Sequence, residues 1–144
     1  MDRRELLLAM LAAGKGRAFQ PAQIQKAVFL ICANLPHLVR SGPSYIFMPY
    51  NYGPFDRNVY VEAGNLQAEG TAIIAPSANG RWMTYAASDE GLRQGEMILA
   101  RLKLESRRYV ESVAEWVLAQ SFGSLVKSIY DAYPEMRENS IFQG

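Results

Sequence analysis

The fold prediction depends on one stretch, MPYNYGPFDRNVYVEAGNLQAEG at residues 48–70, in which an aromatic turn and a Gly-Pro step precede an amphipathic segment that ends at a glycine. Proline fixes its own φ and keeps the preceding residue out of the helical region, so Gly53-Pro54 separates the turn from the amphipathic segment. We predict that a helix begins at Phe55 or Asp56 and ends at the final glycine of the stretch. Apolar residues recur at helical spacing along one face of this helix, at Phe55, Val59, Ala63 and Leu66.

Two strands and a second helix are predicted after this glycine. Residues 71–75 (TAIIA) and 81–86 (RWMTYA) are typical of strands, and the turn formers between them include Asn79-Gly80, which favours a hairpin. Ser88 is a favourable N-cap for the next helix. A helix, a hairpin and a capped helix in this order resemble the second half of a winged helix-turn-helix unit, a likeness of fold that does not name a function.

Apolar periodicity and capping residues predict further helices on both sides of this unit, and a short apolar run predicts one more strand. The helices are expected at residues 2–13, 20–34, 89–104, 106–119 and 122–132, and the strand at Tyr45–Met48. We therefore predict one α+β domain over residues 1–144, mainly helical, with a winged-helix-like core of three helices plus a β-hairpin wing and additional C-terminal helices. Its parts are expected to be the core at about residues 2–104, a C-terminal helical extension at about 105–134 and a tail at 135–144.

The composition is that of a globular chain, because 49% of the 144 residues are hydrophobic and 20% are charged. The net charge of +1 provides no strong field to attract nucleic acid or an anionic membrane. No stretch approaches the roughly 20 apolar residues of a membrane span. The start of the chain, MDRRELLLAML, contains acids and lacks the cleavage site of a signal peptide, so a cytoplasmic protein of bacterial or phage type is expected.

Catalytic and metal-binding chemistry has few candidate residues. Cys32 is the only cysteine and His37 the only histidine, so neither a disulfide within the chain nor a zinc site of the usual composition can form. Cys32 lies in an apolar helical run and is predicted to be a buried small hydrophobic residue. Asp56, Glu62 and Glu69 lack a facing histidine, and we predict that they belong to a solvated helix face. We therefore expect no enzyme, no catalytic residue, no metal site and no cofactor.

The positions of the charges favour a protein partner over DNA. A winged helix that reads DNA places its third helix in the major groove and its wing beside the backbone, where Lys and Arg contact phosphates. Here the predicted third helix carries Arg57 against three carboxylates, and the hairpin offers only Arg81. A DNA-binding transcriptional regulator is therefore the alternative, disfavoured by the acidic third helix. The cations gather near the start of the chain instead, at Arg3, Arg4, Lys15, Arg17, Lys26 and Arg40.

Three short motifs carry a resemblance to a known family. They are an apolar helical run that begins at Lys26–Leu30 (KAVFL), a Tyr-Gly-Pro step at residues 52–54 that is followed by Tyr60, and a final helix with Tyr133-Pro134. Over about residues 20–140 the chain resembles the Panacea domain, an antitoxin family also described as SocA-like, and its phage- and defence-associated relatives. The resemblance implies a non-enzymatic, mostly helical domain that neutralises the toxin of a toxin-antitoxin system or acts as a proteolytic adaptor.

The aromatic residues beside the Gly-Pro step form the predicted interaction surface, because Tyr and Phe anchor the centres of protein interfaces. Phe47 and Phe55 are expected to be buried, whereas Tyr50 and Tyr52 can be buried or exposed, since their hydroxyls need water or a partner. We predict an antitoxin-like or adaptor-like domain that binds a toxin or a protease system; a homodimer is left open. The predicted partner-binding residues are Tyr50, Tyr52, Gly53, Pro54, Arg57 and Tyr60.

Overall fold

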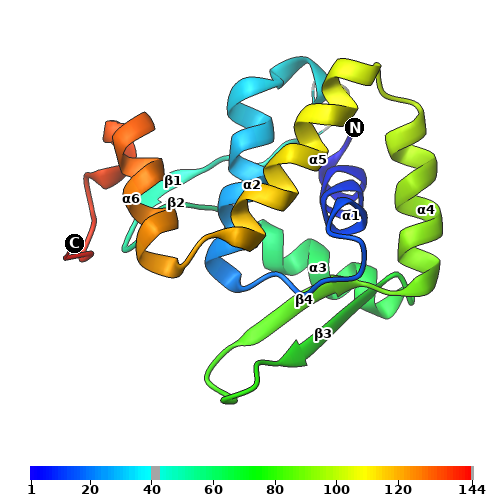
Figure 1. Cartoon of the computed structure of the whole chain (residues 1–144), viewed down its shortest axis with the longest axis horizontal. Helices are drawn as coiled ribbons and strands as arrows, with labels where there is room; N and C mark the ends of the chain where they lie inside the picture. The colour runs from blue at the N-terminus through cyan, green and yellow to red at the C-terminus, as the bar shows by residue number, and fades with distance from the viewer. Residues whose placement is uncertain (40–42, 144) are drawn as a thin grey trace.

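Six α-helices and two antiparallel hairpins form the regular structure of residues 1–39 and 43–143, the part of the chain that the computed structural model describes (Figure 1). The prediction of a mainly helical α+β fold is confirmed. The helices are α1 (Arg3–Ala13), α2 (Pro21–Asn34), α3 (Asn58–Ala68), α4 (Asp89–Ala100), α5 (Leu104–Ala119) and α6 (Phe122–Ala132), with short 3₁₀ helices at Pro36–Val39 and Pro134–Arg137. The strands are β1 (Met48–Tyr50), β2 (Gly53–Phe55), β3 (Ala72–Pro76) and β4 (Met83–Ala87).

Helix α1 lies at the centre of the fold, in contact with α3, α4 and α5 (Figure 1). Its residues from Leu6 to Ala13 are all buried. A helix that is apolar on every side is stable only in an interior, which accounts for this central position. Neither α1 nor any other helix of the described part is both long and apolar enough to span a membrane.

Helix α4 is fixed by close contacts at two of its glycines. Ser88 caps the helix as predicted, because its hydroxyl accepts a hydrogen bond from the Gly91 amide at 3.0 Å. The same hydroxyl donates to the Gly70 carbonyl at 2.7 Å, which joins α4 to the end of α3. Further along, α4 approaches α1 so closely that a Cβ on Gly95 would lie 2.3 Å from the Ala12 Cβ.

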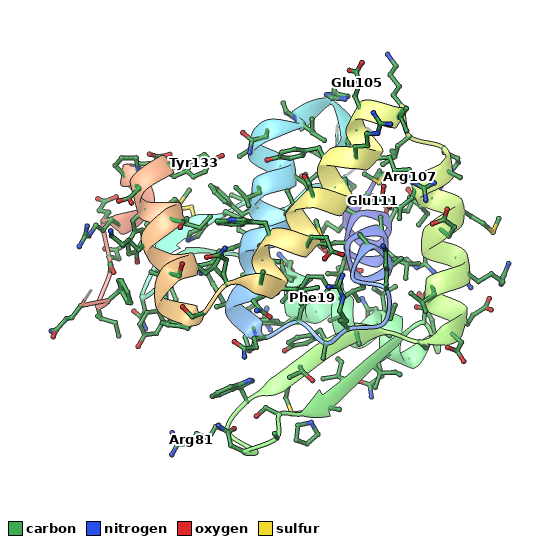
Figure 2. All side chains as sticks on the ribbon, in the orientation of Figure 1. Phe19, Arg81, Glu105, Arg107, Glu111 and Tyr133 are labelled. Atoms are coloured by element: carbon green, nitrogen blue, oxygen red, sulfur yellow. The ribbon has the colours of Figure 1, made fainter. Side chains whose placement is uncertain are left out.

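The hairpin predicted after α3 is present as β3 and β4, which pair antiparallel with Ile73 opposite Ala86. Phe19, in the link between α1 and α2, adds a bridge to β4: its amide donates to the Tyr85 carbonyl at 2.7 Å, and its carbonyl accepts from the Tyr85 amide at 2.9 Å. Figure 2 shows Phe19 against the helices near the base of the hairpin and Arg81 at its tip, pointing away from the body. The hairpin therefore projects from a base that is anchored in the core.

Two predicted boundaries beside the Gly-Pro step are wrong. Helix α3 begins at Asn58, not at Phe55 or Asp56, because Phe55 is still part of strand β2. The strand predicted at Tyr45–Met48 begins three residues later and ends two residues later, as β1. The proline of the step fixes a φ that suits a strand as well as the start of a helix, so the local sequence does not distinguish the two.

Candidate functional site

The β1–β2 hairpin carries the Tyr-Gly-Pro step and lies between α2 and α6 (Figure 1). Pro49 faces Pro54 across the two strands, and Asn51 and Tyr52 make the turn. Neither proline can donate a hydrogen bond, so the pair fits a position at which an antiparallel ladder exchanges none. Gly53 has a φ of +111°, a conformation that residues with a side chain rarely adopt.

Two reciprocal hydrogen bonds between Gln25 and the Asp56 backbone fix this hairpin to α2. The Asp56 amide donates to Gln25 Oε1 at 3.0 Å, and Gln25 Nε2 donates to the Asp56 carbonyl at 2.9 Å. The Asp56 carboxylate accepts from the Ile46 amide at 2.7 Å and from the Asn58 amide at 2.8 Å. Asp56 is buried, so its prediction as part of a solvated helix face is wrong. Its carboxylate instead joins the segment before β1 to the start of α3.

Lys26 of α2 lies next to the turn glycine. A Cβ on Gly53 would be 3.6 Å from Lys26 Cε and 3.7 Å from Lys26 Nζ. Only 3% of the lysine is exposed, and it forms no hydrogen bond or ion pair with any described residue. Burial lowers the Lys26 pKa from 10.5 to about 8, because the charged amine loses its hydration. Two of the sequence motifs, the lysine of the apolar helix and the Tyr-Gly-Pro step, therefore meet in space.

Aromatic rings surround this meeting point. Tyr50 stacks on Phe55 with ring centroids 5.0 Å apart, and Phe55 contacts Tyr60 at 5.9 Å. Tyr52 meets Phe122 of α6 edge to face at 5.0 Å. Burial raises the Tyr60 pKa to about 12, so its hydroxyl stays protonated at neutral pH. Tyr50 is 52% exposed and Tyr52 41%, so these rings present apolar surface to solvent.

The lysine and the rings line a cavity of about 260 Å³, called here the Lys26 cavity. Among the described residues of its lining, Lys26 supplies the only charged side chain. The lining consists of Pro21, Ala22, Gln25 and Lys26 of α2, the hairpin residues Tyr50–Phe55, Tyr60 of α3 and Phe122 of α6.

A second hollow, of about 500 Å³, adjoins the Lys26 cavity and is called here the Trp82 groove. Its lining shares Pro21, Ala22, Tyr52 and Phe122 with the cavity, so the two are contiguous. From these shared residues the groove extends to Trp82 of the β3–β4 hairpin. The remaining lining residues are Gln20, Gln120 and Ser121.

The residues after α6 hold the turn of the β1–β2 hairpin. The Ile141 amide donates to the Asn51 carbonyl at 2.9 Å, and the Ser140 hydroxyl donates to the same carbonyl at 3.3 Å. Ser140 in turn accepts a hydrogen bond from the Tyr130 hydroxyl of α6 at 2.6 Å. Within its described residues, the predicted tail at 135–144 is therefore packed on the site.

Most of the predicted partner-binding residues come together in this structure. Arg57 does not line the Lys26 cavity and instead lines a neighbouring hollow of about 380 Å³ with Phe55, Tyr60 and Val61. Phe47 and Phe55, expected to be buried, are both half-buried. The predicted residues that line the Lys26 cavity are Tyr50, Tyr52, Gly53, Pro54 and Tyr60.

Sequence reasoning missed Lys26, Gln25 and Phe122 as members of the site. A signal for Lys26 was available, because Ala22 and Phe29 lie four residues before it and three after it, on the same apolar face of α2. No local pattern points to Gln25 or Phe122, whose roles depend on where the hairpin packs.

Two of the cations near the start of the chain form ion pairs within the fold, and Arg3 donates a hydrogen bond to the Ser44 carbonyl at 3.0 Å. Arg4 forms an ion pair with Glu69 at 2.6 Å, and Arg17 forms one with a glutamate of α5. Lys26 is buried, and Arg40 lies outside the described residues. The sequence cluster therefore does not provide a continuous free basic surface over the part of the chain that can be described.

Burial brings the pKa of the Lys26 amine closer to neutral pH, whereas it moves the pKa of the Tyr60 hydroxyl further away. Cys32, expected to be buried, is half-buried, and burial raises the pKa of its thiol to about 11. A thiol with this pKa is a poor nucleophile at neutral pH. In residues 1–39 and 43–143 no group of three or more His, Cys, Asp or Glu side chains is arranged to hold a metal ion.

Comparison with known proteins gives no independent guide to this site. A scan of the chain against protein-family models finds no match, and a search of curated proteins finds no relative. What the site does must therefore be inferred from its own residues.

The Gly53→Ala substitution is expected to lower the free energy of unfolding by about 1–2 kcal/mol. The added methyl group would make ordinary contacts, at 3.5 Å from Tyr130 and 3.6 Å from Lys26, so the loss arises from the positive φ. Urea unfolding measures it. Gly64→Ala is the control, since that helical glycine has open space around it and alanine there should be neutral or stabilise by up to about 1 kcal/mol. An unchanged stability of Gly53→Ala would contradict the strained turn.

Proposed function

We propose that this chain is a non-enzymatic interaction domain that binds a partner protein through the Lys26 cavity and the Trp82 groove. The observation that carries this proposal is the gathering of partly exposed aromatic residues around one contiguous depression. Exposed aromatic side chains beside a hollow are typical of the anchor regions of protein interfaces. The partly exposed rings are those of Tyr50, Tyr52, Trp82 and Phe122.

The partner in this proposal is a toxin that the domain neutralises or a protease system for which it acts as adaptor. The resemblance to the Panacea domain supports this assignment, because Lys26 and the Tyr-Gly-Pro step, which carry the resemblance, line the same cavity. A winged-helix-like arrangement belongs to the same proposal, with α1 to α3 as its helices and the β3–β4 hairpin as its wing. The element order α3, β3, β4, α4 supports it.

The competing function is a DNA-binding regulator. The small number of cations on α3 and on the β3–β4 hairpin disfavours it. Helix α3 and the residues flanking it carry Arg57 as their one cation, and the β3–β4 hairpin carries Arg81 alone. Phosphate contacts by Lys and Arg supply much of the affinity for DNA, so these elements are poorly suited to the groove and backbone contacts of a winged helix. A mobility-shift experiment at physiological salt, with the DNA upstream of its own gene, should show no specific complex.

The direct test of the proposed function is photocrosslinking in cells. A photoreactive phenylalanine analogue at Tyr52 should form a crosslink to one predominant protein, which mass spectrometry then identifies. The same analogue at Leu104 is the control, because that residue is exposed at the start of α5, outside the cavity and the groove. Equal crosslinking from both positions, or none from Tyr52, would contradict the proposed surface.

The Tyr52→Ala substitution is expected to weaken binding of the crosslinked partner by about tenfold or more. Tyr52 is 41% exposed and lines both the cavity and the groove, so its truncation removes contact area from both. Because the ring is already partly in water, we expect the free energy of unfolding to fall by no more than about 1 kcal/mol. Titration calorimetry and urea unfolding measure the two quantities. A loss of stability larger than the loss of binding would mean that Tyr52 only covers the core.

A further inference from the structure

Lys26 is a buried cation for which the described residues provide no counter-ion. Among them, every side-chain nitrogen or oxygen that is fully shielded from solvent has a hydrogen-bond partner. The Lys26 ammonium has no such partner, so it must keep some contact with the cavity that its residue lines. A desolvated charge of this kind is unfavourable until an anion approaches it.

Two of the other polar groups of the lining are already engaged within the fold. Both amide atoms of Gln25 are bonded to the Asp56 backbone, and the Asn51 carbonyl accepts from the residues after α6. The rest of the lining is formed largely by aromatic rings, prolines and small residues. Among the described residues, the cavity therefore presents one charged donor, the Lys26 ammonium, in a largely apolar setting, which matches one carboxylate carried on an apolar group.

The sizes of the Lys26 cavity and the Trp82 groove favour a carboxylate that belongs to a polypeptide over that of a free small acid. The Lys26 cavity, at about 260 Å³, lies just below the roughly 300–1,000 Å³ of small-molecule pockets. It shares four lining residues with the Trp82 groove, which is larger and whose described lining residues carry no charged side chain. A free small acid would occupy only the cavity, whereas an extended segment would fill both.

Taking these observations together, we infer that the Lys26 cavity binds an Asp or Glu side chain of the partner protein, whose flanking apolar residues lie along the Trp82 groove. The inference rests on the proposed function and specifies the chemistry of the partner. The ion pair forms next to Gly53, where the absence of a side chain leaves room beside Lys26 Nζ. The aromatic rings shield the pair from water, which strengthens it.

Panning a phage library of random heptapeptides against the purified protein tests this inference without knowledge of the partner. The enriched sequences should contain one Asp or Glu next to apolar or aromatic residues. Lys26→Met removes the charge and keeps an unbranched side chain, so it should enrich apolar sequences without the acid. Lys127→Met, at an exposed position of α6, is the matched control and should select the same peptides as the wild type.

The strongest peptide is then compared with a copy in which its acid is replaced by the corresponding amide. Fluorescence anisotropy should show that this change weakens binding to the wild type by about tenfold or more and leaves binding to Lys26→Met nearly unchanged. The probe 3-phenylpropionate, a free acid with one ring, separates the two sources of carboxylate. It should displace the peptide only at concentrations far above the dissociation constant of the peptide.

The outcomes separate this inference from the proposed function. Enriched peptides without an acid would overturn the inference and leave the interaction surface standing. Tight binding of 3-phenylpropionate without enriched peptides would make the cavity a site for small acids, and no enrichment at all would also overturn the inference. Acid-dependent peptide binding without a Tyr52 crosslink in cells would support the cavity chemistry and count against the proposed cellular partner.

Discussion

The Lys26→Met substitution is expected to stabilise the protein by about 2–3 kcal/mol at neutral pH. The Lys26 pKa falls from 10.5 to about 8 because the amine is buried without a counter-ion. Since one pKa unit corresponds to about 1.4 kcal/mol, the charged form is disfavoured in the fold by roughly 3 kcal/mol. Methionine is unbranched, apolar and adaptable, and it can fill the space of the lysine stem without that penalty.

This gain should depend on pH in a definite direction. Below pH 8, Lys26 carries its proton in both the folded and the unfolded state, so the full penalty applies. Between pH 8 and 10.5 the unfolded state holds the proton and the folded state has lost it, so the wild type gains stability as the pH rises and the advantage of Lys26→Met shrinks. Tyr60, whose pKa is raised to about 12, titrates in both proteins, so the difference between them isolates Lys26.

Urea unfolding of the two proteins at about pH 7 and about pH 10 measures this effect. Lys127→Met controls for the loss of a lysine and should change neither the stability nor its pH dependence, because Lys127 is exposed. A variant at Lys26 that is less stable than the wild type at pH 7 would show that the ammonium already has a stabilising partner in the fold, and the carboxylate inference would lose its basis.

The Gly91→Ala substitution is expected to destabilise the protein by about 3 kcal/mol or more. A Cβ on Gly91 would lie 1.8 Å from the Thr71 carbonyl oxygen, which is a backbone atom and cannot rotate away. That carbonyl also accepts a hydrogen bond from the Ser88 amide at 3.1 Å. Relief of the clash therefore requires α4 to separate from the start of the β3–β4 hairpin.

Gly123→Ala is a closely matched control for this prediction. Gly123 lies in the first turn of α6, which is capped by Ser121 as α4 is capped by Ser88, but a Cβ there would have its nearest neighbour at 3.9 Å. Alanine at this position should be neutral or slightly stabilising. Urea unfolding of both variants measures the difference, and a Gly91→Ala protein within about 1 kcal/mol of the wild type would mean that α4 is not held as tightly as described.

The elements that could be predicted are those whose local signals agree. Apolar periodicity and a serine cap placed α6 correctly, and two β-rich runs around a turn placed the β3–β4 hairpin. The start of α3 was misplaced because Gly53-Pro54 suits either a strand or a helix boundary. The pairing of β2 with β1 decides in favour of the strand. This pairing is a contact between two segments, and no local sequence pattern predicts it.

Of the residues in the candidate site, only the aromatic ones near the turn and the Gly-Pro step itself could be predicted from the sequence. Tyr50, Tyr52 and Tyr60 attract notice as aromatic residues near a turn, whereas Lys26 is a residue type that is seldom buried. Its burial depends on the β1–β2 hairpin lying beside α2, which the Gln25–Asp56 hydrogen bonds secure. The position of Lys26 on an apolar helix face suggests that it could be buried. Its place in the candidate site becomes evident only when the fold is known.

The contact between the residues after α6 and the β1–β2 turn links the cavity to a local opening equilibrium. The wall that contains Asn51 is held from outside by Ile141 and Ser140. Segments that are largely exposed, as residues 134–143 are, generally open at a lower free energy than the core, so this wall can loosen while the rest of the protein stays folded. An occupant that needs the closed wall must also supply the free energy of closing it, and its apparent affinity falls by the fraction of molecules that are open. The affinity of the site for its ligand therefore depends in part on Ser140 and Ile141, which do not line the Lys26 cavity.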